Sequence, residues 1–370
     1  MRKELFIENT TEPVENQKVN GITIALGGGR IQWLDIYKGL AILLVVIGHL
    51  EISDSLYKYI YMFHMYAFFF AAGITFKINK SETFIQFLKK NISRLYIPYL
   101  FFAFMWDVTN MLIQVTHGNH YDFSISALSQ NFVAVLIGRG IIYSNASIGP
   151  AWFLLCLLVV RIIFWSILKI TNKNLLLQFA ICAMLFIIGH QLRGKEFIPF
   201  FIIQSLTTFI FVFWGYVSKE YCMTLAKKSN TILLFVVAII SIVFTVFLAH
   251  NSNCKLVLLN NILPDNILVL LGAAVSGITS IVCFSVFLSK IPFIKTILIW
   301  CGVNSLIIMG THMEIRTAIN LLFGNIEMCN QLMVVVKTIT IILIIIPIVY
   351  ILNSYVPFLV NGNNKPQRTS

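Results

Sequence analysis

Lys38 and His49 are the residues whose types and spacing most clearly favour chemistry, because both lie in one apolar segment, 34–49. An ionisable group in such a segment is a functional candidate, since burying its charge in lipid costs free energy. Eleven residues advance an α-helix by about three turns, so both side chains would share one stripe, about 16 Å apart. The stripe predicts a cation near one membrane surface and a general base near the other. Snorkelling of Lys38 and a structural histidine are the alternative interpretations.

Two further histidines fall in apolar segments, and we expect them near the same site. His64 lies within 56–76, where we expect it deeper in the membrane, near the middle of the bilayer. His312 ends the apolar segment 293–313 and would approach the same surface as His49. The three histidines belong to three different helices and none has a second ligand at short spacing, so we predict no metal site. We predict His49, Lys38 and His64 as catalytic residues and place His312 on the substrate side.

Other charges in or beside apolar segments have both structural and functional interpretations. Asp107 and Arg161 could pair with each other inside the membrane. Lys89, Lys90 and Arg94 precede Pro98 and could simply flank a membrane helix. They could equally bind an anionic cofactor such as a phosphorylated nucleotide.

The composition excludes an ordinary soluble domain. Hydrophobic residues make up 58% of the 370 residues and charged residues only 11%, whereas soluble domains usually carry about 25% charged residues. The net charge of +12 suggests nucleic acid at first sight. The positive residues lie in loops between apolar segments, where membrane topology explains them, so we expect no nucleic-acid partner and the lipid bilayer as solvent.

The apolar segments predict an all-α, polytopic transmembrane bundle of about ten helices. The expected spans are 31–51, 56–76, 95–116, 150–169, 174–192, 197–217, 230–249, 267–289, 293–313 and 332–356. An even number of spans places both termini on one side. With that side inside, eighteen Lys and Arg residues fall inside and six outside, which predicts an N-in, C-in protein of the cell membrane.

One membrane domain, 31–356, accounts for nearly the whole chain. Residues 1–30 and 357–370 are polar and are expected to be cytosolic tails, since residues 1–30 lack the basic-then-apolar layout and small-residue cleavage site of a secretory signal. The short apolar segment 132–143 contains Gly138 and Gly140 and is expected to be interfacial or re-entrant. The seven cysteines form no metal motif. A disulfide between Cys254 and Cys329 is left open, since both fall in loops placed outside.

Several short motifs together resemble the acyltransferase-3 family of membrane O-acyltransferases, especially its fucose 4-O-acetylase-like branch. Each motif is short, but their order and spacing are specific, and the resemblance covers about 30–356. Asn91 stands where the family often has a second Arg. The matching residues are Asp35, Lys38, Gly39 and His49; Phe63, His64, Met65, Phe68, Phe69, Phe70 and Gly73; Arg94, Ile97, Pro98 and Tyr99; Trp152, Phe153 and Leu154; Phe211, Gly215 and Tyr216; and Ser305 and His312.

The resemblance implies transfer of an acyl group, expected to be acetyl, from acyl-CoA to a hydroxyl of a surface polysaccharide or its lipid-linked precursor. Acetyl-CoA would then be the donor, with Lys38, Lys90 and Arg94 binding it, while His312 and Trp152 would lie on the substrate side. A bacterial inner membrane is the expected location. A secondary transporter or polysaccharide exporter is the main alternative, although the chain has only nine prolines to break its helices.

Overall fold

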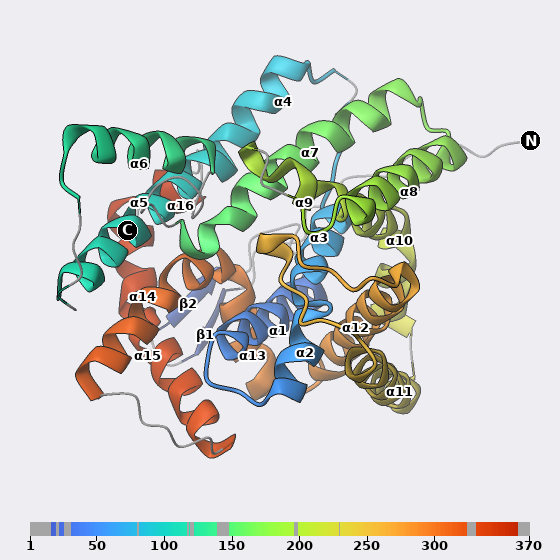
Figure 1. Ribbon diagram of the computed structural model, residues 1–370. Coiled ribbons are helices and arrows are strands. Elements are labelled where there is room, and N and C mark those ends of the chain that lie inside the picture. The colour runs from blue at the N-terminus through green and yellow to red at the C-terminus, as the bar shows by residue number, and fades with distance from the viewer. Residues whose placement is uncertain are drawn as a thin grey trace, which may run out of the picture.

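The computed structural model describes residues 16–19, 22–25, 31–79, 81–116, 118, 122–138, 148–195, 199–228, 230–323 and 331–361. It confirms the predicted all-α class, since helices make up almost all of these residues (Figure 1). The exception is an antiparallel hairpin of β1 (Asn16–Val19) and β2 (Ile22–Ala25). It belongs to the predicted N-terminal tail and precedes the helices.

Helix α1 (Gln32–Gly48) lies at the centre and contacts α2, α3, α12, α13, α14 and α15. The helices are α2 (Asp54–Tyr61), α3 (His64–Ile74), α4 (Phe84–Asn91), the π-helix η1 (Ile92–Tyr96), α5 (Ile97–Thr116), α6 (Ile125–Ile137), the turn η2 (Gly149–Ala151), α7 (Trp152–Ile170), α8 (Leu175–Gln191), the turn η3 (Pro199–Phe201), α9 (Ile202–Leu206), α10 (Phe209–Lys228), α11 (Thr231–His250), the turn η4 (Leu258–Asn260), α12 (Ile267–Leu288), α13 (Pro292–Val303), α14 (Ser305–Phe323), α15 (Gln331–Tyr355) and α16 (Pro357–Asn361).

Each of the ten predicted spans falls on helical structure, but the number ten is not confirmed. Five of the described helices are long and apolar enough to cross a membrane, or seven if each of two bent pairs forms one span. The difference arises where the chain breaks a predicted span or keeps it short. Helix α1 has 17 residues, and the predicted span 56–76 divides into α2 and α3 at Met62 and Phe63. The chain is therefore an integral membrane protein with several discontinuous helices.

The predicted ninth span is one of the bent pairs, and this corrects the expected place of His312. Helices α13 and α14 meet at Asn304 and are bent by 83°. Helix α14 then continues to Phe323, so His312 lies in its middle instead of at the end of a span. Apolar periodicity identified both helices correctly, but it carries no information about the bend between them.

Two helix pairs pack closely because each partner contributes a glycine. A Cβ atom on Gly302 of α13 would meet the backbone oxygen of Asp35, and one on Gly39 of α1 would meet the backbone of Leu298. Gly73 of α3 and Gly215 of α10 approach the opposite backbones in the same reciprocal way. Small residues allow such contact between membrane helices, where no hydrophobic effect drives helices together. These contacts fix α1 against α13 and α3 against α10.

Contacts between loops agree with the predicted alternation of sides. Lys255 pairs with Asp54 at 2.7 Å, Arg193 pairs with Asp265 at 3.1 Å, and Lys58 reaches the backbone oxygen of Ser252. The charge count places Lys58, Arg193 and Lys255 on the outer side, and their partners lie in loops on the same predicted side. A separate set of contacts joins loops assigned to the inner side, including Lys169 with the Asn79 backbone and Lys290 with Thr231. Which side is cytosolic stays a prediction from the charge bias.

Candidate active site

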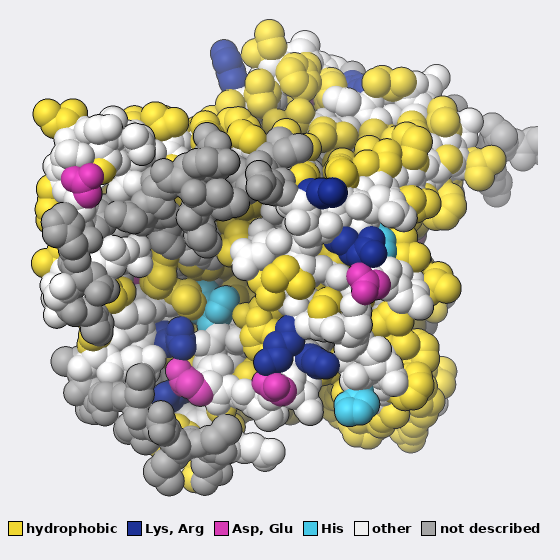
Figure 2. Space-filling model, viewed as in Figure 1, with side chains coloured by type: hydrophobic (Ala, Val, Ile, Leu, Met, Phe, Trp, Pro, Cys, Tyr) yellow, Lys and Arg dark blue, Asp and Glu magenta, His cyan; other side chains and the backbone are white. Residues whose placement is uncertain are grey.

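His49 and His312 lie together at the C-terminal end of α1, which is predicted to face outside. His49 follows the last residue of α1, and its ring centroid is 5.1 Å from that of His312 on α14, with an angle of 39° between the planes. His312 is buried, whereas His49 is partly exposed. Figure 2 shows a hollow where α1 and α14 lie in Figure 1; a histidine is visible inside it, beside basic and acidic side chains. The sequence prediction that these two histidines approach one surface agrees with this contact.

Hydrogen bonds set the tautomer of two of the histidines. In His64 the Nδ1–H group donates to the carbonyl of Ile60 at 2.9 Å. In His312 it donates to the carbonyls of Ile308 and Met309 at 3.0 and 2.8 Å. A carbonyl can only accept, so Nδ1 carries the proton and Nε2 of the neutral ring keeps its lone pair. The Nε2 atom of His312 is buried, and no residue in the described ranges forms a hydrogen bond with it.

Tyr61 lies between the histidine pair and His64. Its ring centroid is 6.4 Å from that of His49 and 4.8 Å from that of His64. Its hydroxyl donates to the backbone oxygen of Gly48 at 3.3 Å, and its ring stacks on Tyr57 one turn earlier in α2. His64 is therefore buried one ring away from His49, at the start of α3, and Tyr61 joins α2 to the end of α1.

An ion cluster lies beside the histidines, and the sequence did not predict it. Glu51 binds Arg316 of α14 at 3.0 Å and Lys337 of α15 at 2.8 Å. Partial burial raises the pKa of Glu51, but the hydrogen bonds from Lys337 and Arg316 outweigh it and lower this pKa to about 2. Two signals in the sequence point to the cluster: Lys337 is a lone charge in a span, and Arg316 follows His312 by one helical turn.

Lys38 forms an ion pair at the other end of α1. Its ammonium lies 2.7 Å from the carboxylate of Asp35, one turn earlier, and the Asp35 carboxylate is almost fully buried. This pair neutralises the charge that the sequence analysis assigned to catalysis and to cofactor binding. Lys38 is thus placed next to Asp35 at the contact of α1 with α13, whereas Lys90 and Arg94 lie on α4 and η1, against α7.

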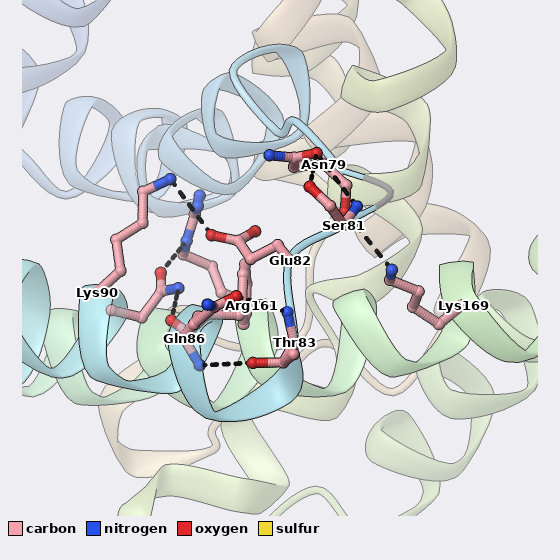
Figure 3. Close-up of polar contacts among 10 residues, drawn as sticks. Asn79, Ser81, Glu82, Thr83, Gln86, Lys90, Arg161 and Lys169 are labelled. Atoms are coloured by element: carbon pink, nitrogen blue, oxygen red, sulfur yellow. Dashed lines mark hydrogen bonds and ion pairs between the residues drawn. The ribbon is translucent and has the colours of Figure 1, made fainter.

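Arg161 joins the predicted anion site formed by Lys90 and Arg94, and it corrects one predicted pairing. Its Nε–H group donates to the Asn91 side-chain oxygen at 2.6 Å, so its partner is Asn91 and not Asp107. The guanidinium also lies over the Phe76 ring, 4.9 Å from its centroid. Figure 3 shows Arg161, Lys90 and Glu82 reaching toward one another, and the Lys90 ammonium is 3.6 Å from the Glu82 carboxylate.

The local sequence explains how these cations are positioned. Thr83 and Gln86 form a capping box that starts α4, with both reciprocal hydrogen bonds present (Figure 3). Pro98 has no N–H group and its ring crowds the carbonyl of Arg94, four residues earlier. The π-helix η1 lies at this point and contains Arg94. A π-turn widens the helix locally and such turns are frequent at functional sites.

Trp152 starts α7 and is buried among aromatic rings. Its ring contacts are with Phe201, at 5.7 Å between centroids, and with Phe153. The preceding turn η2 packs against α5 and α14, the helix that carries His312. The turn η2 therefore connects Trp152 to the helix that carries His312. The place of Trp152 on the substrate side stays a prediction.

Two other sequence hypotheses concern metals and disulfides. Within the described ranges, no group of three or more His, Cys, Asp or Glu side chains is arranged to hold a metal ion. Cys254 carries a free thiol. Its suggested partner Cys329 lies outside the described residues, as does Arg139 in the predicted interfacial segment.

Comparisons with known proteins identify the family. A family model described as an acyltransferase domain matches residues 31–354. No curated protein and no solved structure matches the chain. The matched range contains the histidine pair, the ion cluster and the inner cations. Because the match covers well over half of the chain, this integral membrane protein belongs to the acyltransferase-3 family.

Proposed function

We propose that this protein is an O-acetyltransferase that moves the acetyl group of acetyl-CoA to a hydroxyl of a cell-surface polysaccharide or its lipid-linked precursor. The contact between His49 and His312 beside the outer hollow carries this proposal. An alcohol is a weak nucleophile until a base takes its proton, and a neutral imidazole is the side chain best suited to that work near neutral pH. The family match supplies the acyl transfer.

His49 is the proposed general base, because it is the more exposed ring of the pair. It takes the proton of the acceptor hydroxyl while the oxygen attacks the thioester carbonyl. A carbon–oxygen bond forms, the carbon–sulfur bond breaks, and the leaving CoA sulfur receives a proton. In a second version the acetyl group passes first to a nitrogen of His49 and then to the hydroxyl. His312 supports both versions, because its free Nε2 lone pair can accept an N–H group of His49 and orient that ring.

The phosphates of acetyl-CoA are proposed to bind Lys90, Arg94 and Arg161. These three cations lie near one carboxylate, Glu82, which leaves an excess of positive charge. Guanidinium groups bind phosphate through paired hydrogen bonds, and Arg161 uses only Nε toward Asn91. The cluster lies on the side predicted to be cytosolic, where acyl-CoA is made. Lys38 is already paired with Asp35, about 16 Å along α1 from His49, and is proposed to line the path of the donor between its phosphates and its thioester.

The test is transfer of labelled acetyl groups, together with mass spectrometry of surface glycans from cells with and without the protein. His49→Ala should lower transfer by about 10²–10⁴-fold, the usual contribution of a general base. His250→Ala is the matched control, because His250 is exposed at the end of α11 on the predicted outer side. Full O-acetylation by the His49→Ala protein at normal abundance would eliminate both versions of the mechanism.

Transport is the second candidate, since discontinuous helices such as α13 and α14 also occur in secondary transporters. The same cells distinguish the two. A transporter would move an unmodified substrate across the membrane without acyl-CoA, whereas the proposed enzyme would leave a new ester on the glycan.

A further inference from the structure

The ion cluster of Glu51, Arg316 and Lys337 has an unequal charge balance. One carboxylate serves two cations, with Arg316 at 3.0 Å and Lys337 at 2.8 Å. The side chain of Lys337 is only 12% exposed and that of Arg316 30%, while Glu51 is 50% exposed. The cations are thus the buried members and the carboxylate is the accessible one. Burial of charge is costly unless the charge is paired, so this arrangement leaves positive charge in need of a partner.

Arg316 also has hydrogen-bonding capacity that the protein does not use. Its Nη2 atom donates to Glu51, whereas its Nε atom is buried and has no hydrogen-bond partner among the described residues. A guanidinium typically binds an oxyanion through two parallel N–H groups. The single bond to Glu51 therefore leaves this guanidinium with a donor that an anionic oxygen could accept from.

The cluster lies where an acceptor would have to bind. Arg316 follows His312 by four residues on α14, so both side chains lie on one face of that helix. Glu51 follows His49 by two residues, in the turn after α1. In Figure 2 the histidine in the hollow has basic and acidic side chains beside it. A sugar whose hydroxyl reached His49 would bring its neighbouring substituents to Arg316 and Lys337.

Glu51 shows which ligand the two cations accept. Each of its carboxylate oxygens binds a different cation, so the two groups are spaced to share a single carboxylate. Glu51 is on a short loop and half exposed, which makes it the member that an incoming anion can displace or join. A neutral sugar would offer nothing to replace this interaction.

We propose that the acceptor carries an oxyanion, a carboxylate or a phosphate, and that Arg316 and Lys337 bind it beside His49 in competition with Glu51. This inference rests on the proposed function and adds the chemical class of the acceptor to it. The accepted glycans would be acidic polymers, such as those containing uronic acids or phosphorylated sugars. The ion cluster would then select the acceptor, and Glu51 would occupy the site in its absence.

The first experiment compares matched acceptors, with acetyl-CoA as donor and the full-length protein in membranes. The probes are a glucuronic acid-containing oligosaccharide, the same oligosaccharide after reduction of its carboxyl groups, and the reduced oligosaccharide carrying phosphate esters. The wild type should favour an acidic probe over the reduced one by about tenfold or more in kcat/KM, as expected of a site that loses charged hydrogen bonds. A preference for the uronate or for the phosphate ester identifies the source of the oxyanion.

Two substitutions separate anion binding from a purely structural ion cluster. Lys337→Gln should raise KM for the acidic probe by a larger factor than KM for the reduced probe, whereas Glu51→Gln should lower KM for the acidic probe by removing the competitor. These opposite directions support the proposal and do not depend on how stable either protein is.

If both substitutions instead impaired acidic and reduced probes alike, the cluster would be structural and the inference wrong. Equal transfer to acidic and reduced probes by the wild type would also overturn it, while leaving the proposed function intact. No transfer to any probe would overturn the proposed function together with the inference.

Discussion

At the C-terminal end of α1, His49 contacts the buried His312, and His312, Glu51 and Lys337 are held by short contacts. The cluster of α4, η1 and α7, on the predicted inner side, is different, because it is built from Lys and Arg side chains and its Lys90 is half exposed. The difference follows from the work proposed for each region. A base must be held in one tautomer and orientation, whereas phosphate binding needs unpaired positive charge that solvent and ligand can reach.

The strongest test of this contrast replaces each of the two supporting histidines in turn. His312→Gln should lower acetyl transfer about 100-fold, because it removes the imidazole in contact with His49. His64→Gln should have a smaller effect, because the ring of Tyr61 separates His64 from His49. Transfer rates at equal protein abundance give the comparison. A larger loss in the His64 variant would place the reacting centre on the other side of Tyr61.

The second test probes the inner region alone. Arg161→Gln should raise KM for acetyl-CoA about tenfold with little change in kcat, which corresponds to the loss of one charged hydrogen bond. Lys169→Gln is the matched control on the same helix, since the Lys169 ammonium contacts the backbone oxygen of Asn79 and lies over the Trp165 ring. If kcat fell and KM did not, Arg161 would act on the reaction instead of on donor binding.

A third substitution asks whether α1 must be held rigidly between the two regions. Gly302→Ala introduces a Cβ atom where the Asp35 backbone lies, and overpacking of this kind costs about 1–3 kcal/mol. The melting temperature should fall by several degrees, and transfer should fall in proportion to the folded fraction. Gly194→Ala is the control. Gly194 has open space around it, so this substitution adds the strain of a positive backbone φ without a packing clash. An unchanged melting temperature for Gly302→Ala would show that α1 and α13 can separate.

The smallest effect concerns pH at the ion cluster. The folded pKa of Glu51, about 2, lies below its ordinary value near 4.5. Its contribution to stability is therefore complete above pH 4.5 and is lost as the pH falls toward 2. Between pH 5 and 8 the wild type and Glu51→Gln should have thermal stability curves of the same shape. A step in their difference within that range would mean that Glu51 titrates there.

The sequence predicted what depends on local pattern. The helical class and the approach of His49 to His312 could be predicted from apolar length and family motifs, whereas the shared stripe of Lys38 and His49 stays a prediction. The Asn91–Arg161 and Glu51–Lys337 contacts could not, because each joins helices far apart in the chain. Such contacts depend on helix crossing angles and on bends such as that at Asn304, which residue periodicity does not encode.

The substitution of Asn91 for an Arg shows how such a contact can mislead. Read along one helix, the change weakens the predicted anion site by one positive charge. In the folded protein, the Asn91 side-chain oxygen accepts a hydrogen bond from the Arg161 guanidinium on α7. A different helix therefore supplies the positive charge at this position. Neither residue alone indicates this arrangement, because Arg161 reads equally well as an isolated charge within a span.

The glycine contact between α1 and α13 also limits which sequence changes α1 can tolerate. Because Gly39 is fixed against Leu298, the number of residues from Gly39 to His49 determines where the His49 side chain lies. Inserting or deleting one residue would turn the imidazole by about 100° around the helix axis, away from His312. Substitution of one lipid-facing aliphatic residue for another leaves this spacing unchanged. Homologous chains should therefore show frequent substitutions between positions 39 and 49, but no insertions or deletions there.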